Sequence, residues 1–190
     1  MDRETRLSVY SALMYPYFKY CCEVWDVFGE TQSKRLQKLQ NRAARIITNL
    51  SNDVDHSIAL GELGWEPLKA DRKKTKAKMM YKLLNNMGPN SLTNLFSYKS
   101  ELTNYNLRDI SSGLHLPKPR TNNMKKSFMY DGAFLWNSIP REIRGSTSLN
   151  SFQKKIATCI DIWKDKSAVK YMHVYRGYPV NSLITFFSSL

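Results

Sequence analysis

The chain has 190 residues, of which 42% are hydrophobic and 12% aromatic, and this composition excludes a disordered tail. It contains 29 lysines and arginines against 16 acidic residues, so its formal net charge of +13 predicts attraction to a polyanion, either a nucleic acid or an anionic membrane surface. The sequence has no apolar run near the roughly 20 residues of a membrane-spanning helix, no signal-peptide pattern, and no cysteine spacing typical of a disulfide framework. We therefore expect an intracellular, soluble and basic protein.

The hydrophobic period is helical through much of the chain, beginning near the N-terminus. Leu7, Tyr10, Met14 and Tyr17 share one face of a predicted helix. Pro16 lies inside this pattern, and we expect it to end or kink the helix because proline has no backbone N–H.

The segment from residue 31 to residue 50 has the clearest pattern in the sequence. Its apolar residues occupy about 100° of a helix circumference: Leu36, Leu39, Ala43, Ile46, Ile47 and Leu50. Its cations occupy a separate arc of about 100°: Lys34, Arg35, Lys38, Arg42 and Arg45. No acidic residue lies between Thr31 and Leu50. We expect the apolar face to pack into a core while the cations face outward.

Further helices are predicted for residues 57–63, 68–86, 127–136 and 148–163. The helix predicted at residues 68–86 carries seven basic residues, which are distributed around its whole circumference and do not form a single basic face. The helical period fades between residues 97 and 121, where Leu114 and Leu116 alternate as in a short strand. The predicted fold is mainly α, an amphipathic helical bundle with a loop-rich segment and room for one short β-hairpin. We divide it into a helical region (1–96), a C-terminal module (97–166) and a loosely ordered tail (167–190).

The sequence predicts no catalytic site, metal site or cofactor. A turn or helix cap explains Asp53, Asp55 and the neighbouring His56 better than a metal site does. Asp131 follows a tyrosine but lacks the second aspartate needed to hold two metal ions. The cysteines lack the spacing of zinc ligands and are expected to be small buried hydrophobic residues.

Two basic clusters are the candidate binding residues, and the first is the cationic arc of residues 34–45. A solvated face normally mixes both charges, so the lack of acids favours contact with nucleic-acid phosphates over a merely solvated face. The second cluster lies in and after a proline-bearing loop and comprises Lys118, Arg120, Lys125 and Lys126. The nearby Phe128, Tyr130 and Trp136 could stack bases, or they could form the core of the C-terminal module, which is the favoured interpretation. Membrane binding is less favoured because the apolar arc contains no Trp or Phe.

Several segments resemble a known family. Residues 36–48, LQKLQNRAARIIT, resemble the segment that follows the polymerase core in non-LTR retrotransposon reverse transcriptases of the jockey and chicken-repeat type. Residues 20–25 are similar to the stretch that precedes it. Similar segments follow in the family's order at residues 62–68, 80–85, 105–108, 116–121, 132–140, 143–144 and 148–155. The resemblance extends from residue 7 to residue 160, whereas the tail after Asp165 resembles nothing in the family.

The resemblance implies thumb-like helices and a C-terminal extension of an RNA-directed DNA polymerase, without the Asp-Asp turn and endonuclease that the family's activity needs. It implies that the first cluster grips the template RNA–primer duplex, that the second contacts RNA or target DNA, and that the palm and fingers are the protein neighbours. It also implies a nuclear location or a cytoplasmic ribonucleoprotein. Alone, the chain is expected to bind RNA and DNA with little sequence preference and to polymerise nothing. The alternative is a non-enzymatic interaction domain, or an inert relic of a decayed element.

Overall fold

The computed structural model describes residues 1–26, 29–102 and 113–159. Within these ranges the chain is mainly α-helical, as predicted, and an isolated antiparallel bridge joins Tyr98 to Leu114. The expected β-hairpin is therefore reduced to this one bridge in the part of the chain that is described. The predicted tail, residues 167–190, lies outside the described residues.

The N-terminal helix runs through Pro16 instead of ending there. It consists of α1 (Arg3–Val9), a π-helical turn η1 (Tyr10–Met14) and α2 (Tyr15–Lys19). A proline inside a regular α-helix lacks a hydrogen bond, and its ring clashes with the carbonyl of the preceding turn. The wider π turn directly before Pro16 relieves this conflict, so the helix continues for one more turn before α3 (Cys22–Trp25).

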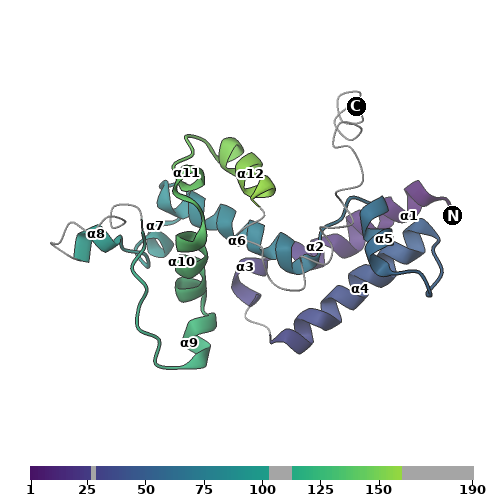
Figure 1. The fold of residues 1–190 in the computed structure, drawn as a ribbon, viewed down its shortest axis with the longest axis horizontal. Coiled ribbons are helices and arrows are strands. Elements are labelled where there is room, and N and C mark those ends of the chain that lie inside the picture. Colours follow the sequence, from purple (N-terminus) through teal and green to yellow (C-terminus); the bar gives the residue numbers. More distant parts are fainter. Residues whose placement is uncertain (27–28, 103–112, 160–190) are drawn as a thin grey trace.

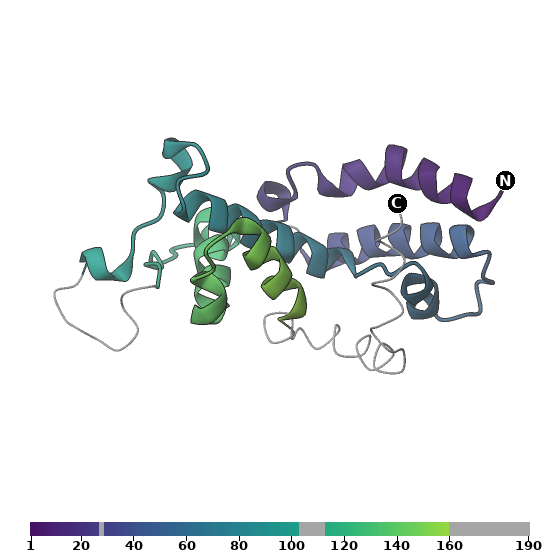
Figure 2. The same ribbon diagram turned by 90° about the horizontal axis from the view of Figure 1, so that it is seen from above.

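The long helix α4 (Glu30–Thr48) is where predicted, but its buried face is rotated from the apolar arc. Leu39 and Ile46 were expected in the core and are 51% and 54% exposed, whereas Ala43 and Ala44 are buried. The reason is that α4 packs against three neighbours: the N-terminal helix, α5 (His56–Glu62) and α6 (Leu68–Leu84). Figure 2 shows α4 lying beside the N-terminal helix. Small alanine side chains allow this close approach, and the two larger apolar residues are left on the outer side.

Helix α6 (Leu68–Leu84) joins the two larger of the three hydrophobic cores found among the described residues, and the smallest lies between α4 and α5 (Figure 1). Its first residue, Leu68, packs in a core with Tyr10 of the N-terminal helix and Ile47 of α4. Its later turns carry Met80 and Tyr81 into a second core. That core also contains Leu114, Ala133, Leu135, Trp136, Ile139, Phe152 and Ile156.

Six shorter helices follow α6 in the described part of the chain: α7 (Asn90–Thr93), α8 (Lys99–Leu102), α9 (Asn122–Lys126), α10 (Phe128–Ser138), α11 (Arg141–Arg144) and α12 (Leu149–Thr158). Three of them, α7, α10 and α12, contact it. Side-chain caps begin three of them, because the hydroxyls of Thr121, Ser127 and Ser148 each accept a backbone N–H of the first turn. Residues 160–163 of the predicted last helix lie outside the described residues. The boundary near residue 96 stays a prediction, since α6 belongs to both cores.

Candidate nucleic-acid interface

Four cations of the first cluster are exposed on the outer side of α4: Lys34, Arg35, Lys38 and Arg42. Lys34 is 4.0 Å from Glu30, which lies one turn earlier and also 3.6 Å from Lys69. Within the described residues, Arg35, Lys38 and Arg42 form no ion pair. These three side chains therefore carry exposed positive charge along two turns of the helix.

Arg45, the fifth predicted cation, has a different environment. Its side chain is half-buried, and its guanidinium Nη2 donates to the backbone carbonyl of Val54 at 2.8 Å. This bond ties the end of α4 to the loop that leads into α5. The structure therefore gives Arg45 a structural contact in addition to its place on the predicted arc.

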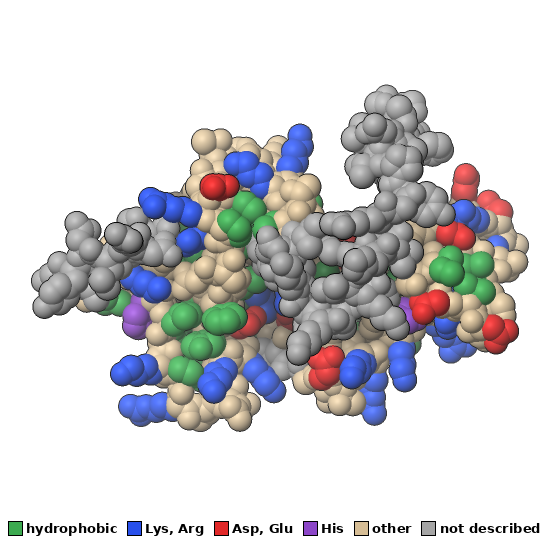
Figure 3. Space-filling view, viewed as in Figure 1, with side chains coloured by type: hydrophobic (Ala, Val, Ile, Leu, Met, Phe, Trp, Pro, Cys, Tyr) green, Lys and Arg blue, Asp and Glu red, His purple; other side chains and the backbone are tan. Residues whose placement is uncertain are grey.

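The second cluster is exposed at all four positions. Lys118 and Arg120 lie on the loop before α9, whereas Lys125 and Lys126 form its last turn. No ion pair involves any of them among the residues that are described. Figure 3 shows lysine and arginine side chains along the lower edge of the molecule, over α9 and over the start of α4. Lysine and arginine side chains also lie along the upper edge, over α11 and α12, so the positive charge is not confined to one edge in this view.

The aromatic residues near the second cluster divide between core and surface. Trp136 is buried, and Phe128 packs at the edge of the core against Phe96. Tyr130 instead stacks on Phe134, whose side chain is 56% exposed. The core interpretation therefore holds for two of the three residues, and Phe134 is a surface residue that the sequence reasoning missed. A signal was present, since Tyr130 and Phe134 are one helical turn apart.

Two of the basic residues on α6 are not on the surface. Arg72 and Lys76 each have a side chain that is 3% exposed. Arg72 Nε lies 2.7 Å from an Asp26 oxygen, and Lys76 Nζ lies 3.2 Å from the other oxygen of Asp26 and 2.5 Å from Asp131. These ion pairs join α6 to the end of α3 and to α10, so part of the predicted basic field is internal structure.

The acidic residues considered for metal binding have structural contacts. Asp55 caps α5 by accepting the backbone N–H of Ser57 at 2.8 Å, and Asp53 accepts from the Ser51 hydroxyl at 3.2 Å. The cap interpretation is therefore confirmed. No group of three or more potential metal ligands occurs in the described ranges.

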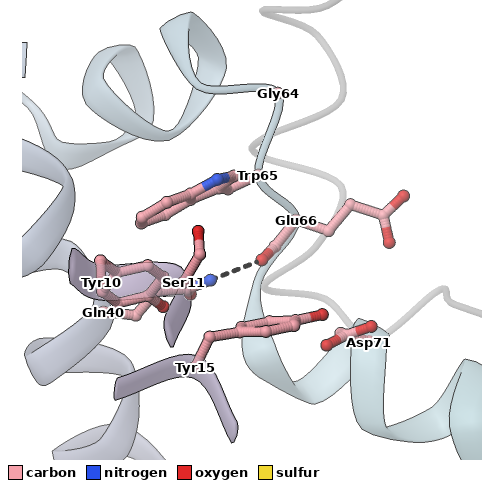
Figure 4. A pocket seen from close by; sticks show the side chains of 8 residues that line it. All are labelled: Tyr10, Ser11, Tyr15, Gln40, Gly64, Trp65, Glu66 and Asp71. Atoms are coloured by element: carbon pink, nitrogen blue, oxygen red, sulfur yellow. Dashed lines mark hydrogen bonds between the residues drawn. The ribbon is translucent and has the colours of Figure 1, made fainter. Parts of the chain in front are cut away.

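A cavity of about 290 Å³ lies between the N-terminal helix, α4 and the start of α6 (Figure 4). Trp65 and Tyr15 border the opening, and Tyr10 stacks on Trp65 with ring centroids 4.4 Å apart. Asp71 binds Lys19 at 2.5 Å, and the carboxylate of Glu66 binds Lys74. The pKa of Lys19 is raised, since the contact with Asp71 outweighs the opposing effect of burial. The carboxylates at this cavity are thus neutralised by neighbouring lysines.

Comparisons with known proteins give one partial similarity to report. A stretch of 48 residues, 25% of this chain, is 37% identical to a protein of Drosophila melanogaster described as a probable RNA-directed DNA polymerase from transposon X-element. The match spans 5% of that protein's length. No family model matches the chain, and no solved structure matches it. Part of the chain is therefore related to a transposon RNA-directed DNA polymerase. Among the described residues, no helix is long and apolar enough to cross a membrane.

Proposed function

We propose that this chain belongs to the C-terminal region of a non-LTR retrotransposon reverse transcriptase of the jockey and chicken-repeat type, beyond the polymerase core. In the complete protein it holds the template RNA–primer duplex through the exposed cations of α4. The similarity of a 48-residue stretch to a transposon RNA-directed DNA polymerase supports the relation to a reverse transcriptase, whereas the C-terminal position and the type of element rest on the resemblance of the sequence segments. The observation that carries the second part is the set of exposed cations without ion pairs among the described residues, Arg35, Lys38 and Arg42.

The spacing of these three cations suits a phosphate backbone. Arg35 and Arg42 are seven residues apart, which is about 10 Å along a helix axis. One strand of a duplex carries a phosphate about every 3.4 Å along its axis, so the face of α4 spans about three phosphates. Contacts of this kind fix the position of a duplex but do not read its sequence. We therefore infer binding with little sequence preference.

The chain contributes binding and no catalysis of its own in this proposal. Polymerisation by the whole protein would need carboxylates that hold two metal ions, and here Asp131 binds Lys76 while Asp55 caps a helix. Metal-dependent nucleotide incorporation by the purified chain would contradict this assignment. A primer-extension assay on a primed RNA template measures it directly.

Exposed apolar side chains on the segment from the N-terminal helix to α3 favour a protein neighbour as well. Leu13, Tyr17, Tyr20 and Val24 are between 64% and 80% exposed, although side chains of this size are usually buried. We infer that the polymerase palm and fingers cover these side chains in the complete protein. From the resemblance of the sequence we also infer that the complete protein works as a ribonucleoprotein, in the cytoplasm or the nucleus.

Fluorescence anisotropy on a labelled RNA–DNA duplex, measured over a salt series, tests the role of α4. The test variant changes Arg35, Lys38 and Arg42 to Gln. The matched control changes three other exposed cations, Lys82, Lys154 and Lys155, to Gln. Both variants therefore lower the formal net charge from +13 to +10. If the three residues of α4 touch phosphates, the slope of log K against log salt becomes less negative by about 2.7 in the test variant alone.

Each outcome separates the proposal from its alternatives. Equal loss in both variants would mean that net charge alone attracts the duplex, and the α4 interface would be wrong. Absence of binding by the folded chain would make the cations of α4 a solvated face. The chain would then be better described as an interaction domain or as a relic of a decayed element.

A further inference from the structure

A stacked pair of aromatic rings lies on the outer face of α10. Tyr130 and Phe134 are one turn apart, with ring centroids 6.5 Å apart and planes inclined by 8°. The opposite face of the same helix carries Ala133 and Trp136 into the core, where they are 1% and 4% exposed. Since Phe134 is 56% exposed, it adds little to that core. Its ring is therefore accessible to a ligand.

The surroundings of the pair are basic. The second cluster, Lys118, Arg120, Lys125 and Lys126, is exposed on the loop and helix that precede α10. No acidic residue occurs between residues 113 and 130. The next one, Asp131, lies 2.5 Å from the buried Lys76. An acidic protein surface or a polyanion would complement this charge, and the exposed ring of Phe134 favours a polyanion that also carries planar groups.

Single-stranded nucleic acid has both features. Its phosphates complement the cations, and its unpaired bases can stack on exposed rings, whereas the bases of a duplex already stack on one another. Helix α9 packs against α10, and the rise from Ser127 to Phe134 is about 10 Å, so Lys125 and Lys126 lie within reach of a few nucleotides from the rings. Lys118 and Arg120 lie on the loop that leads into α9.

We propose that Tyr130 and Phe134 form a base-stacking platform, and that with the second cluster they bind single-stranded RNA or DNA. Phe134 is the outer ring on which a base stacks, and Tyr130 supports it from below. The four cations hold the phosphates on the side of α9. This inference extends the proposed function, because it assigns single strands to the α9–α10 surface and leaves the duplex to α4.

The experiment uses the full chain and three labelled ligands: a single-stranded RNA of twelve nucleotides, the same strand with abasic sites in place of its bases, and the RNA–DNA duplex. Phe134→Leu keeps an exposed apolar side chain but removes the ring. Leu95→Ser, at another exposed apolar position, is the matched control. We expect Phe134→Leu to weaken binding of the base-bearing strand by roughly tenfold. Binding of the abasic strand and of the duplex should stay within about twofold.

The cations are tested separately on the same single strand. Changing Lys118, Arg120, Lys125 and Lys126 to Gln should make the salt slope less negative by up to about 2.8, while Phe134→Leu should leave the slope unchanged. Circular dichroism shows that each variant is folded. An affinity of folded Phe134→Leu for the base-bearing strand equal to that of the wild type would overturn the platform, as would absence of single-strand binding by the wild type. The duplex arm reports on α4 independently, so the two proposals can fail separately.

Discussion

The adjacent residues Cys21 and Cys22 have contrasting environments. Cys21 is exposed and has a left-handed backbone, with φ of 49°, whereas Cys22 is fully buried at the start of α3. Burial raises the pKa of the Cys22 thiol from 9.0 to about 11. Because the thiolate is the reactive form, Cys22 should be inert for two reasons, limited access and a low thiolate fraction.

Alkylation with iodoacetamide at pH 8 should therefore modify Cys21 in the native chain and leave Cys22 unmodified. In urea both should react. Tandem mass spectrometry of the tryptic peptide 20–34 distinguishes the two positions. Modification of Cys22 at the rate of Cys21 under native conditions would show that α3 does not bury this side chain.

Tyr10 provides the second prediction at the residue scale. Its side chain is 4% exposed, and its hydroxyl has no hydrogen-bond partner among the described residues. A buried hydroxyl without a partner loses its hydration without compensation, so Tyr10→Phe should raise the free energy of unfolding by about 1 kcal/mol. Urea denaturation at pH 7 measures the change. A loss of stability of similar size would mean that the hydroxyl forms a favourable bond.

The same residue predicts a pH dependence. Burial raises the pKa of Tyr10 from 10.0 to about 12, so between these values the unfolded chain releases a proton that the folded chain retains. The titration of Tyr10 therefore leaves the free energy of unfolding unchanged below pH 10 and lowers it as the pH rises from 10 toward 12. Tyr10→Phe should remove this part of the alkaline destabilisation. The test is the urea denaturation midpoint of the wild type and of Tyr10→Phe, each measured at pH 7 and at pH 10.5. The midpoint should fall less between these two pH values in Tyr10→Phe.

At the scale of elements, α6 depends on its buried ion pairs. Asp26 binds both Arg72 and Lys76, and its side chain is 16% exposed, whereas Asp131 binds Lys76 alone and is 43% exposed. Removing one partner of a buried pair leaves an uncompensated charge. Asp26→Asn should therefore destabilise the fold by about 3 kcal/mol, and Asp131→Asn by about 1 kcal/mol.

The two variants control for each other, because both replace a carboxylate by the amide of the same shape. Urea denaturation followed by circular dichroism gives the free energy of unfolding of each. Equal and small losses would mean that α6 is held by its apolar contacts alone. A larger loss for Asp131→Asn would reverse the ranking that burial predicts.

The same helices show how far the sequence predicts the structure. Periodicity located α4, α5, α6, α10 and the start of α12 within a few residues, because each depends on local apolar spacing and caps. It did not predict the rotation of α4, since the buried position of Ala44 depends on the approach of α5. It also missed the burial of Arg72 and Lys76, whose partners are 46 to 55 residues away in the sequence. For the candidate site, the spacing predicted four exposed cations on α4 correctly, but not that Arg45 is half-buried against the loop before α5, and the exposure of Phe134 required the packing of α10.

At the scale of the whole molecule, the exposed apolar side chains are unevenly distributed. Leu13 and Tyr17 lie on the N-terminal helix, Tyr20 directly after it and Val24 on α3, and each is at least 64% exposed. Leu39 and Ile46 are exposed on the neighbouring helix α4, and the Arg6 guanidinium of α1 donates to the carbonyl of Ile46. The N-terminal helix and α4 therefore lie side by side, as in Figure 2, and both leave apolar side chains uncovered.

An uncovered surface of this kind should make the isolated chain associate with itself, because apolar surface is removed from water when two copies meet. Light scattering coupled to size-exclusion chromatography should show a mass that rises above 22.1 kDa with increasing concentration. Leu13→Ser combined with Tyr17→Ser should lower this association. Met87→Ser combined with Leu95→Ser, at exposed positions near α7, should leave it unchanged. If both pairs act equally, association is a general property of the chain and the N-terminal face is not a specific interface. If the Leu13 and Tyr17 pair alone restores the monomer, association is specific to this face, as expected of a surface that a protein neighbour covers in the proposed polymerase.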